Sequence, residues 1–357
     1  MDIKQLLEQL VNTNGSDLFY RTGGVPHMRL DGKVVPIGDT IVTMDDMVKT
    51  MDTICNSKQK EVFSRDGDTD FALYVKELDH RFRVSIFTQR NTPSIVMRSV
   101  RKSTSSFEEL GLPAEVLKKL CMETRGLVLL TGSTGSGKST TIASMVDYIN
   151  AHYNKHILTL EEPIEFTFRD KNSVVNQREL GVDVSSYAVA LRAFTLQSPD
   201  VIYLNNIRDL ETMSAALTAA ETGVLVLSTL HTVNASQSVE RIINFFPQHQ
   251  HQQIRTQLAY LLKGVISLRL LPLKNSVGRI PAYEVMLLTP TISRLIREGK
   301  IWEIPAFLED GSVFGMQSFN QTLIQLFNEG KITEEEAITF SDNKDEFLLL
   351  LRGIRRA

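Results

Sequence analysis

The chain has 357 residues, of which 42% are hydrophobic and 23% are charged, and 39 lysines and arginines nearly balance 42 aspartates and glutamates. This length and apolar content suit two domains with separate cores. The net charge of −3 argues against a nucleic-acid partner, because nucleic-acid-binding proteins usually present a strongly basic face. Cys55 and Cys121 form no CxxC motif or Cys/His cluster, so we expect reduced, packed thiols and no structural zinc. Without a signal-peptide pattern or an apolar run of about 18 residues, we expect a soluble, cytoplasmic protein.

The N-terminal part has the pattern of a small α+β domain. Residues 3–12 place apolar side chains at helical spacing, and residues 44–55 repeat a helical pattern. Short apolar runs separated by Gly, Pro and Asp occupy the rest of the stretch from about 17 to 100, which indicates an antiparallel sheet. We therefore expect a domain over residues 1–100, followed by a Ser/Thr-rich interdomain linker at 101–113.

The remaining residues, 114–357, have the pattern of an α/β domain. Four short aliphatic runs separated by helical patterns occur at 126–132, 156–160, 200–204 and 224–230. This alternation indicates βαβ units and a parallel sheet that helices cover on both faces. After about 248 the pattern becomes mostly helical, including all of 251–266, with one strand-like run at 280–288, and we expect a helical C-terminal region from about 290.

A phosphate-binding loop follows the first of these runs. The segment "GSTGSGKST" matches G-x-x-x-x-G-K-[ST] and lies between a predicted strand and a predicted helix that starts at Lys138. Loop amides and the helix N-terminus would bind phosphate oxygens, while Lys138 would reach the β and γ phosphates and Ser139 would ligate Mg²⁺. We therefore expect ATP and Mg²⁺ as ligands. The expected nucleotide-binding residues of the loop are Gly132, Ser133, Thr134, Gly135, Ser136, Gly137, Lys138, Ser139 and Thr140.

Acidic side chains follow the second strand. Glu161, Glu162 and Glu165 are expected at the carboxyl edge of the parallel sheet, where catalytic groups of α/β proteins collect. A carboxylate within reach of the γ phosphate can orient or deprotonate the attacking water. The same residues could form a solvated acidic turn, but the upstream phosphate loop favours the catalytic interpretation.

The third strand ends in an unusual pair, Asn205 and Asn206, where a P-loop ATPase is expected to carry its Walker B acid. An amide has no negative charge with which to polarise a metal-bound water, and it cannot take a proton. Asp209 is expected to cap the next helix rather than to replace the missing acid. At the exit of the fourth strand, His231 is expected either to sense the γ phosphate or to link the nucleotide state to a neighbouring subunit; the alternative is a packed or solvated loop histidine.

Several segments together resemble the type IV pilus retraction ATPases, the PilT/PilU group of secretion-type ATPases. These segments are "GSTGSGKST", "LEEPIEF", "NQRELGVD", "IRDLETMSAALTAAETG", "STLHT" and "GMQSFNQTL". The resemblance covers nearly the whole chain, and "GSDLFYRTGGVPHMRLDGKVVPI", "RFRVSIFTQRN" and "FNQTLIQLFNEGKIT" are more similar to the PilU branch. The region "TISRLIREGKIWEIP" departs from the "AIRNLIRE" pattern of the PilT branch.

The resemblance implies a fold and an assembly. Each subunit would pair a PAS-like N-terminal domain with a RecA-like ATPase domain, with ATP between the two, in a hexameric ring. The implied partners are further copies of this chain, a PilT-like retraction ATPase and an inner-membrane platform protein of the pilus machine, which would place the chain peripherally at the inner membrane. Arginines of the N-terminal domain approach the nucleotide in this family, and Arg81, Arg83, Arg90 and Arg98 match that stretch. Arg83 and Arg98 are favoured; the alternative is a charged, exposed sheet face.

The resemblance also assigns roles to single residues. Glu161 and Glu165 match the two acids of the Asp box, His231 matches the His box, and Glu162 stands where an aspartate is more usual and is a candidate Mg²⁺ ligand beside Ser139. Asn206 replaces the Walker B glutamate of the family, and Val224 replaces a second histidine. We expect the missing carboxylate and the missing histidine to affect one and the same site.

The sequence thus predicts an ATP-binding motor subunit that promotes pilus retraction and twitching motility with weak hydrolysis. The alternative is a non-hydrolysing regulatory or structural ring subunit that supports an active retraction ATPase. A type II secretion ATPase is a third interpretation, which the whole-chain match and the lack of a four-cysteine zinc segment disfavour.

Overall fold

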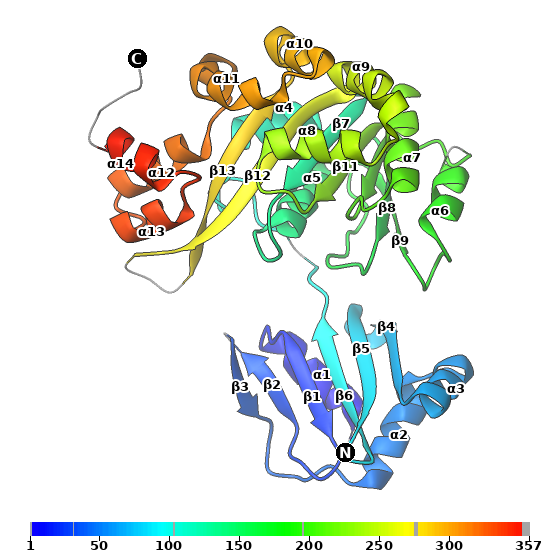
Figure 1. Cartoon of the computed structure of the whole chain (residues 1–357). Helices are drawn as coiled ribbons and strands as arrows, with labels where there is room; N and C mark the ends of the chain where they lie inside the picture. Colours follow the sequence, from blue (N-terminus) through cyan, green and yellow to red (C-terminus); the bar gives the residue numbers. More distant parts are fainter. Residues whose placement is uncertain (1, 31, 103, 195, 275–277, 352–357) are drawn as a thin grey trace. The chain divides into compact units, whose positions relative to one another are not determined.

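The computed structural model describes residues 2–30, 32–102, 104–194, 196–274 and 278–351. The chain divides into two compact units (Figure 1). The first consists of Met1–Ser103 with Glu165–Thr167, and the second of Thr104–Ile164 with Phe168–Ala357. Within the segment 101–113, residues from Thr104 onward thus belong to the second unit, where Phe107 and Leu112 are buried in a hydrophobic cluster.

The first unit is built on a six-stranded antiparallel sheet with strand order β3-β2-β1-β6-β5-β4. Its strands are β1 (Asp17–Arg21), β2 (His27–Leu30), β3 (Lys33–Pro36), β4 (Asp68–Val75), β5 (His80–Gln89) and β6 (Thr92–Ser99), and its helices are α1 (Ile3–Asn12), α2 (Met44–Ile54) and α3 (Ser57–Asp66). Capping boxes at Thr43 and Asn56 begin α2 and α3, because each side chain accepts a hydrogen bond from a backbone N–H of the first turn.

The alternation of side chains along β5 and β6 decides which face of this sheet is buried. Phe82, Val84 and Met97 point into the core, while the intervening Arg83 and Arg98 are exposed. Because successive side chains of a strand point to opposite faces, the two arginines lie on the face opposite the core.

The second unit is built on a seven-stranded sheet with order β13-β12-β7-β11-β10-β8-β9, in which only the β12–β13 pair is antiparallel among the described strands. The strands are β7 (Gly126–Thr131), β8 (His156–Glu161), β9 (Val174–Glu179), β10 (Val201–Leu204), β11 (Leu225–Leu230), β12 (Leu262–Pro272) and β13 (Arg279–Leu287). The helices are α4 (Ala114–Cys121), α5 (Lys138–His152), α6 (Tyr187–Phe194), α7 (Leu210–Glu221), α8 (Ala235–Asn244), α9 (His251–Leu261), α10 (Pro290–Glu298), α11 (Ile304–Asp310), α12 (Phe319–Asn328), α13 (Glu334–Phe340) and α14 (Lys344–Leu351).

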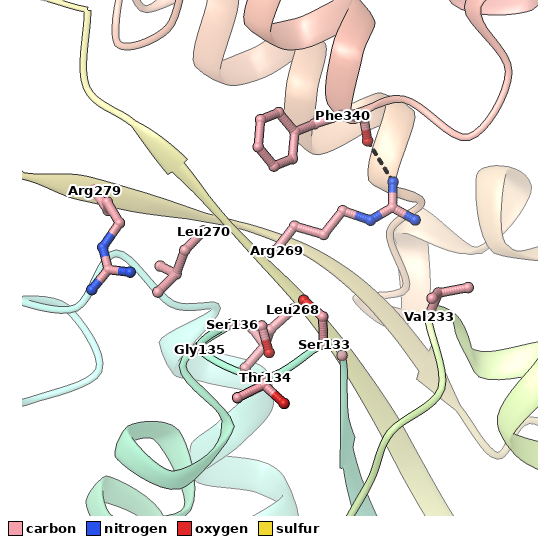
Figure 2. Close-up of a pocket in the computed structure, with 11 residues that line it drawn as sticks. Ser133, Thr134, Gly135, Ser136, Val233, Leu268, Arg269, Leu270, Arg279 and Phe340 are labelled. Atoms are coloured by element: carbon pink, nitrogen blue, oxygen red, sulfur yellow. Dashed lines mark hydrogen bonds between the residues drawn. The ribbon is translucent and has the colours of Figure 1, made fainter.

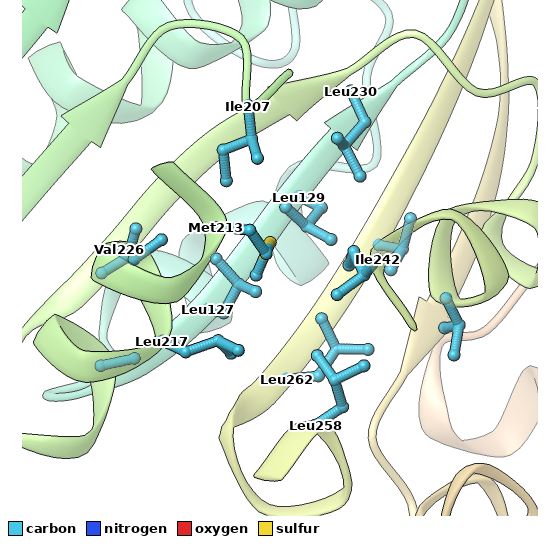
Figure 3. Packing of buried hydrophobic residues seen from close by; sticks show 14 of the residues in the cluster. Leu127, Leu129, Ile207, Met213, Leu217, Val226, Leu230, Ile242, Leu258 and Leu262 are labelled. Atoms are coloured by element: carbon cyan, nitrogen blue, oxygen red, sulfur yellow. The ribbon is translucent and has the colours of Figure 1, made fainter. Parts of the chain in front are cut away.

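Helices cover both faces of this sheet, as the continuous apolar runs predict. On β7, Leu127 and Leu129 pack on one face with side chains of α7, α8 and α9 (Figure 3), while Val128 and Leu130 pack on the other face with α4 and α5. A strand buried on both faces has no polar alternation, which explains why its sequence is uniformly aliphatic. The predicted RecA-like α/β fold is therefore confirmed for this unit.

Two strands differ from the sequence-based expectation. The helix expected over 251–266 ends at Leu261, and the chain continues as β12 between β7 and β13. An apolar segment such as 262–271 suits a buried helix and a buried strand equally, so periodicity alone does not decide between them. The edge strand β9 was not expected, because its sequence, VVNQRE, is largely polar.

The C-terminal helices form a smaller cluster against the β12–β13 hairpin. Phe319 and Leu323 of α12 pack with Leu271 and Ala282 of the two strands. No helix within the described residues is long and apolar enough to cross a membrane.

Candidate nucleotide-binding site

The phosphate loop begins where the buried strand β7 reaches the carboxyl edge of the sheet. Gly132, Gly135 and Gly137 have φ values of 140°, 79° and 100°, which L side chains rarely adopt. A Cβ atom on Gly132 would lie 2.5 Å from the carbonyl oxygen of Leu268 and from the hydroxyl of Ser136. No side chain fits in that space, so this position also requires glycine for steric reasons. The local backbone explains the glycine pattern of the motif.

Lys138 opens α5 and lies almost fully buried under the loop. Its Nζ donates hydrogen bonds to the carbonyl oxygens of Gly132 at 2.8 Å and Ser133 at 2.7 Å. The buried hydroxyl of Ser136 has no hydrogen-bond partner in the described part of the chain. An ammonium held on carbonyls beside an unsatisfied hydroxyl, at the start of a long helix, fits a phosphate group, which would accept hydrogen bonds from both.

A cavity of about 370 Å³ adjoins the loop (Figure 2). Gly132–Ser136, Val233, Leu268, Arg269, Leu270, Arg279 and Phe340 line it. The guanidinium of Arg269 lies 3.7 Å from the ring centroid of Phe319, donates to the carbonyl oxygen of Phe340 and pairs with Asp342. The C-terminal helices are therefore tied to the wall of this cavity. No sequence motif identifies Arg269, Arg279 or Phe340 as lining residues, because they come from elements far from the phosphate loop along the chain.

Glu161 ends β8 with its carboxylate buried and oriented. The side chain is 4% exposed, and its Oε1 accepts hydrogen bonds from the hydroxyl of Thr159 at 2.7 Å and from Nε2 of Gln177 at 3.1 Å. Two neutral donors on β8 and β9 therefore fix this acid at the same sheet edge as the phosphate loop.

The other two predicted acids lie in different surroundings. Glu162 is half-exposed and forms an ion pair with Arg208 at 3.1 Å. Glu165 belongs to the first compact unit, with Phe166 bridging to Arg101. The described residues contain no cluster of three His, Cys, Asp or Glu side chains suited to a metal. Mg²⁺ at a phosphate loop needs no such cluster, since it keeps several waters and binds one or two protein ligands with the substrate phosphates. The hydroxyl of Ser139, in the first turn of α5, fits that donor set.

Asn206 follows β10 in a left-handed conformation with φ 63°. Its backbone N–H donates to the hydroxyl of Thr229 at 3.0 Å, and its buried Oδ1 lacks a partner among the residues with assigned positions. The preceding Asn205 accepts a hydrogen bond from Tyr187 through its carbonyl oxygen at 2.6 Å. Asp209 caps α7 by accepting a hydrogen bond from the N–H of Thr212 at 2.8 Å, which confirms the cap prediction.

His231 lies at the carboxyl end of β11 beside a second cavity, of about 410 Å³. Asn206, Ile207, Arg208, Leu230, His231, Thr232, Val233, Gln237 and Arg241 line it. Partial burial lowers the pKa of His231, and the positive charges of Lys138 and Arg208 lower it further. The imidazole is therefore mostly neutral at pH 7, because the charge of the phosphate-loop lysine opposes protonation of the ring.

Val224 corrects one expectation from the sequence. It precedes β11, whereas His231 follows the same strand, so the two residues are at opposite ends of it. Six residues of strand separate them, or roughly 20 Å. Val224 packs against the large core cluster and not in the phosphate site. The loss of a histidine at 224 is therefore no second defect at the site of Asn206.

The favoured arginines lie in the first unit. Arg83 on β5 and Arg98 on β6 face each other as directly paired residues of neighbouring strands. Both are exposed, and Nε of Arg98 donates to Oδ1 of Asp17 at 2.8 Å.

Comparison with known proteins places this site in a family. The profile of the family described as "Type II/IV secretion system protein" matches residues 2–306. The chain is 39% identical over 352 residues to the type IV pilus ATPase PilU of Pseudomonas aeruginosa, covering 99% of this chain and 92% of PilU. It is 40% identical over 337 residues to the type IV pilus retraction ATPase PilT of the same organism, covering 94% and 97% of the two chains.

A solved structure agrees with these matches. The crystal structure of the pilus retraction motor PilT with bound ADP has a TM-score of 0.88 at 41% identity and covers 97% of this chain and 98% of that one. The expected resemblance to PilU and PilT is thereby confirmed over nearly the whole length. The chain therefore belongs to the type II/IV secretion system protein family, and within it to the type IV pilus ATPases that include PilT and PilU.

Proposed function

We propose that this chain is an ATP-binding motor subunit of the type IV pilus machine, promoting pilus retraction and twitching motility. The observation that carries the proposal is the phosphate loop, in which Lys138 is buried with its Nζ on two loop carbonyls next to the unsatisfied hydroxyl of Ser136. The similarity to PilU and PilT over nearly the whole chain supports the biological assignment.

In this proposal different residues of the chain bind the phosphates, neutralise their charge, orient the attacking water and sense the γ phosphate. Loop amides from Gly132 to Thr140 bind the phosphates, and Lys138 neutralises charge on the β and γ positions. Glu161, held by Thr159 and Gln177, orients the attacking water, and His231 senses the γ phosphate. Ser139 and Glu162 would hold Mg²⁺, which would supply charge neutralisation for the phosphates.

The arginines and the second acid complete the proposed set. Arg83 and Arg98 contribute guanidinium groups to the nucleotide, where they stabilise the charge that develops during phosphoryl transfer. Glu165 assists Glu161 as the second acid of the Asp box. We propose that residues 114–357 form the ATPase domain that binds the nucleotide and that residues 1–100 form a PAS-like domain that carries the arginines. Residues 101–113 would be the linker between the two domains.

Hydrolysis in this proposal is weak, because Asn206 stands where the Walker B acid is expected. Loss of one catalytic carboxylate commonly costs on the order of 10²–10⁴-fold in rate, whereas the phosphate loop preserves binding. The chain would act in a hexameric ring of its own copies, beside a PilT-like ATPase and an inner-membrane platform protein, at the cytoplasmic side of the inner membrane.

The assignment can be tested in a piliated host that lacks its own copy of this chain. Return of the full chain should restore twitching and retraction, whereas the Lys138→Ala variant at equal abundance should not. Normal retraction without the chain, or full rescue by Lys138→Ala, would refute the proposal of an ATP-dependent role.

The second candidate is a regulatory or structural subunit that binds ATP without turning it over, and the amide at position 206 favours it. Phosphate release from purified protein separates the two candidates. Release that stops in Glu161→Gln supports the motor, while tight binding with no release, unaltered by Glu161→Gln, supports the regulatory subunit.

A further inference from the structure

A buried glutamate connects the phosphate loop to the segment that carries His231. Glu284, on β13, is 5% exposed. Its Oε1 accepts hydrogen bonds from the backbone N–H of Ala235 at 2.7 Å and from the hydroxyl of Ser267 at 3.2 Å. Burying a carboxylate costs free energy that its hydrogen bonds must offset, so these two contacts fix the groups that they join.

One of these hydrogen bonds leads to the start of the phosphate loop. The hydroxyl of Thr131 donates to the hydroxyl of Ser267 at 3.0 Å, and Ser267 donates in turn to Glu284. The three side chains are buried and belong to β7, β12 and β13, which are neighbouring strands of the sheet. Thr131 is the last residue of β7 and directly precedes Gly132. The Glu284 carboxylate is therefore tied to the strand end from which the phosphate loop begins.

The other hydrogen bond leads to the start of α8. Ala235 is the first residue of that helix, and Asn234 caps it by accepting a hydrogen bond from the N–H of Gln237 at 2.9 Å. The N–H groups of a first helical turn have no partner within the helix, so Glu284 satisfies one of them, and the helix dipole favours a carboxylate there. Burial raises the pKa of Glu284 to about 7, and the hydrogen bond from Ala235 opposes that rise.

The connection from His231 to α8 is built on the same first turn. His231 directly follows β11 and lies four positions before Ala235. Between them, Thr232 shares a hydrogen bond of 2.6 Å with the hydroxyl of Ser238, which also donates to the carbonyl oxygen of Asn234 at 2.6 Å. These bonds fix the short connection to the first turn of α8, so a shift of that turn would move the connection with it.

We propose that Glu284 is a positioning residue, which fixes the first turn of α8 relative to the phosphate loop and thereby sets where His231 meets a γ phosphate. Its carboxylate acts through the two elements that it joins and not on the nucleotide itself. All of these groups belong to the second compact unit. This inference rests on the proposed function, specifically on the role of His231 as the γ-phosphate sensor.

A purely structural role for Glu284 makes a different prediction. If the carboxylate only stabilises β13 within the sheet, its loss should lower the melting temperature without altering the preference for ATPγS over ADP. Thr322 of α12 offers a matched control, because its buried hydroxyl donates to the carbonyl oxygen of Tyr283 at 2.6 Å. Thr322→Val therefore removes a buried hydrogen bond to the same strand, from α12 instead of α8.

The test uses the purified full-length chain and measures the dissociation constants of ADP and ATPγS, with thermal unfolding recorded for each variant. We expect Glu284→Met, which removes the acceptor, to reduce the preference for ATPγS by about tenfold, as for one lost charge-assisted contact. The constant for ADP should stay within about threefold, since the phosphate loop remains. Glu284→Gln keeps an acceptor oxygen for Ala235 and should retain the preference. Thr322→Val should lower the melting temperature and leave the preference unchanged.

A double variant tests whether Glu284 acts through His231. His231→Ala alone should also reduce the preference for ATPγS by about tenfold. Adding Glu284→Met should reduce it no further, because both changes remove the same contact with the nucleotide. Full additivity of the two losses would overturn the route through His231.

The outcomes separate this inference from the function on which it rests. An unchanged preference in Glu284→Met, beside a reduced preference in His231→Ala, overturns the positioning role and leaves the sensor intact. An unchanged preference in His231→Ala overturns the sensor itself and the inference with it. If Glu284→Met does not fold, Ser267→Ala replaces it, because it breaks the link from Thr131 to Glu284 and leaves the bond to Ala235 in place. The preference should then fall by about threefold, and an unchanged preference contradicts the proposal.

Discussion

The backbone N–H of Asn206 donates a hydrogen bond of 3.0 Å to the side-chain oxygen of Thr229, which ties the end of β10 to its neighbour β11. Asn206 is held there in the left-handed region, at φ 63°. Asparagine and aspartate adopt this conformation more readily than other residues with side chains. The asparagine therefore suits the backbone at this point, although it supplies no acid to the phosphate site.

Asn206→Glu should raise phosphate release if the missing acid limits turnover. We expect a gain of at least about tenfold, since catalytic carboxylates commonly contribute 10²–10⁴-fold. The same substitution should cost about 1 kcal/mol of unfolding free energy, because glutamate is disfavoured at positive φ. Steady-state phosphate release and chemical denaturation measure the two effects.

Asn206→Asp is the matched control, because aspartate adds the charge and tolerates the backbone conformation. It should keep the stability of the natural chain and show a smaller gain in turnover, as its carboxylate is one methylene shorter. Unchanged phosphate release in both variants would show that the amide at position 206 does not limit the rate.

Glu161 should be needed for turnover but not for binding. Glu161→Gln keeps the shape of the side chain and removes the charge, so phosphate release should fall by about 10²-fold or more while the affinity for ATPγS stays within about threefold. Thr159→Val removes one hydrogen bond to the carboxylate, and the rate should fall by about tenfold or less. An equal loss of affinity and rate in Glu161→Gln would instead indicate a binding role.

Glu284 on β13 should make the stability of the second unit depend on pH. Its side chain is 5% exposed and accepts hydrogen bonds from the N–H of Ala235 at 2.7 Å and the hydroxyl of Ser267 at 3.2 Å. Burial raises its pKa from 4.5 to about 7, with Asp342 adding to the rise and the hydrogen bonds and Arg269 opposing it. The folded state therefore holds this proton more tightly than the unfolded chain does.

The sign of the effect follows from that difference in pKa. The contribution of Glu284 to stability is fully present below about pH 4.5 and is lost as the pH rises through about 7. Relative to Glu284→Gln, the natural chain should lose on the order of 3 kcal/mol of unfolding free energy as the pH rises from about 4.5 to about 7. Denaturation at a series of pH values measures the difference, and parallel curves for the two proteins would contradict the assignment.

His231 should link nucleotide affinity to pH. Burial and the charges of Lys138 and Arg208 hold its pKa below the usual 6.5, and a nearby γ phosphate would favour the protonated ring. Because binding would raise the pKa of His231, affinity for ATPγS should increase as the pH falls from 7.5 to about 5.5. The gain should be up to about tenfold for each unit by which the pKa of His231 rises. The His231→Gln variant removes this group, and an identical pH profile for both proteins would exclude His231 as a sensor.

The parts of the fold that could be predicted from sequence are those with a local signal. The strands at 126–132, 156–160, 200–204 and 224–230 are short, uniformly aliphatic runs between helical patterns, and each corresponds to a parallel strand of the sheet. The strand β12 was expected to be helical, because only its pairing with β7 and β13 distinguishes it from an apolar helix.

The phosphate loop could be predicted for the same reason, since its nine residues carry the motif, the turn glycines and the helix start in one segment. The site around it depends on contacts that no motif records. Arg269 meets Phe340 across 71 positions, and Asp17 meets Arg98 across 81. The family pattern places Val224 in one site with Asn206, and only the direction of β11 shows that Val224 lies at the opposite end of that strand.

The most direct measurement of the central claim combines nucleotide affinity with phosphate release on one preparation of the full-length chain. We expect tight binding of Mg-ATP that Lys138→Ala abolishes, together with phosphate release below about 1 s⁻¹, the lower end of common enzyme rates. Rapid release comparable to other P-loop motors, or Mg-ATP binding that survives Lys138→Ala unchanged, would contradict the account of an intact binding site with a weakened catalytic one.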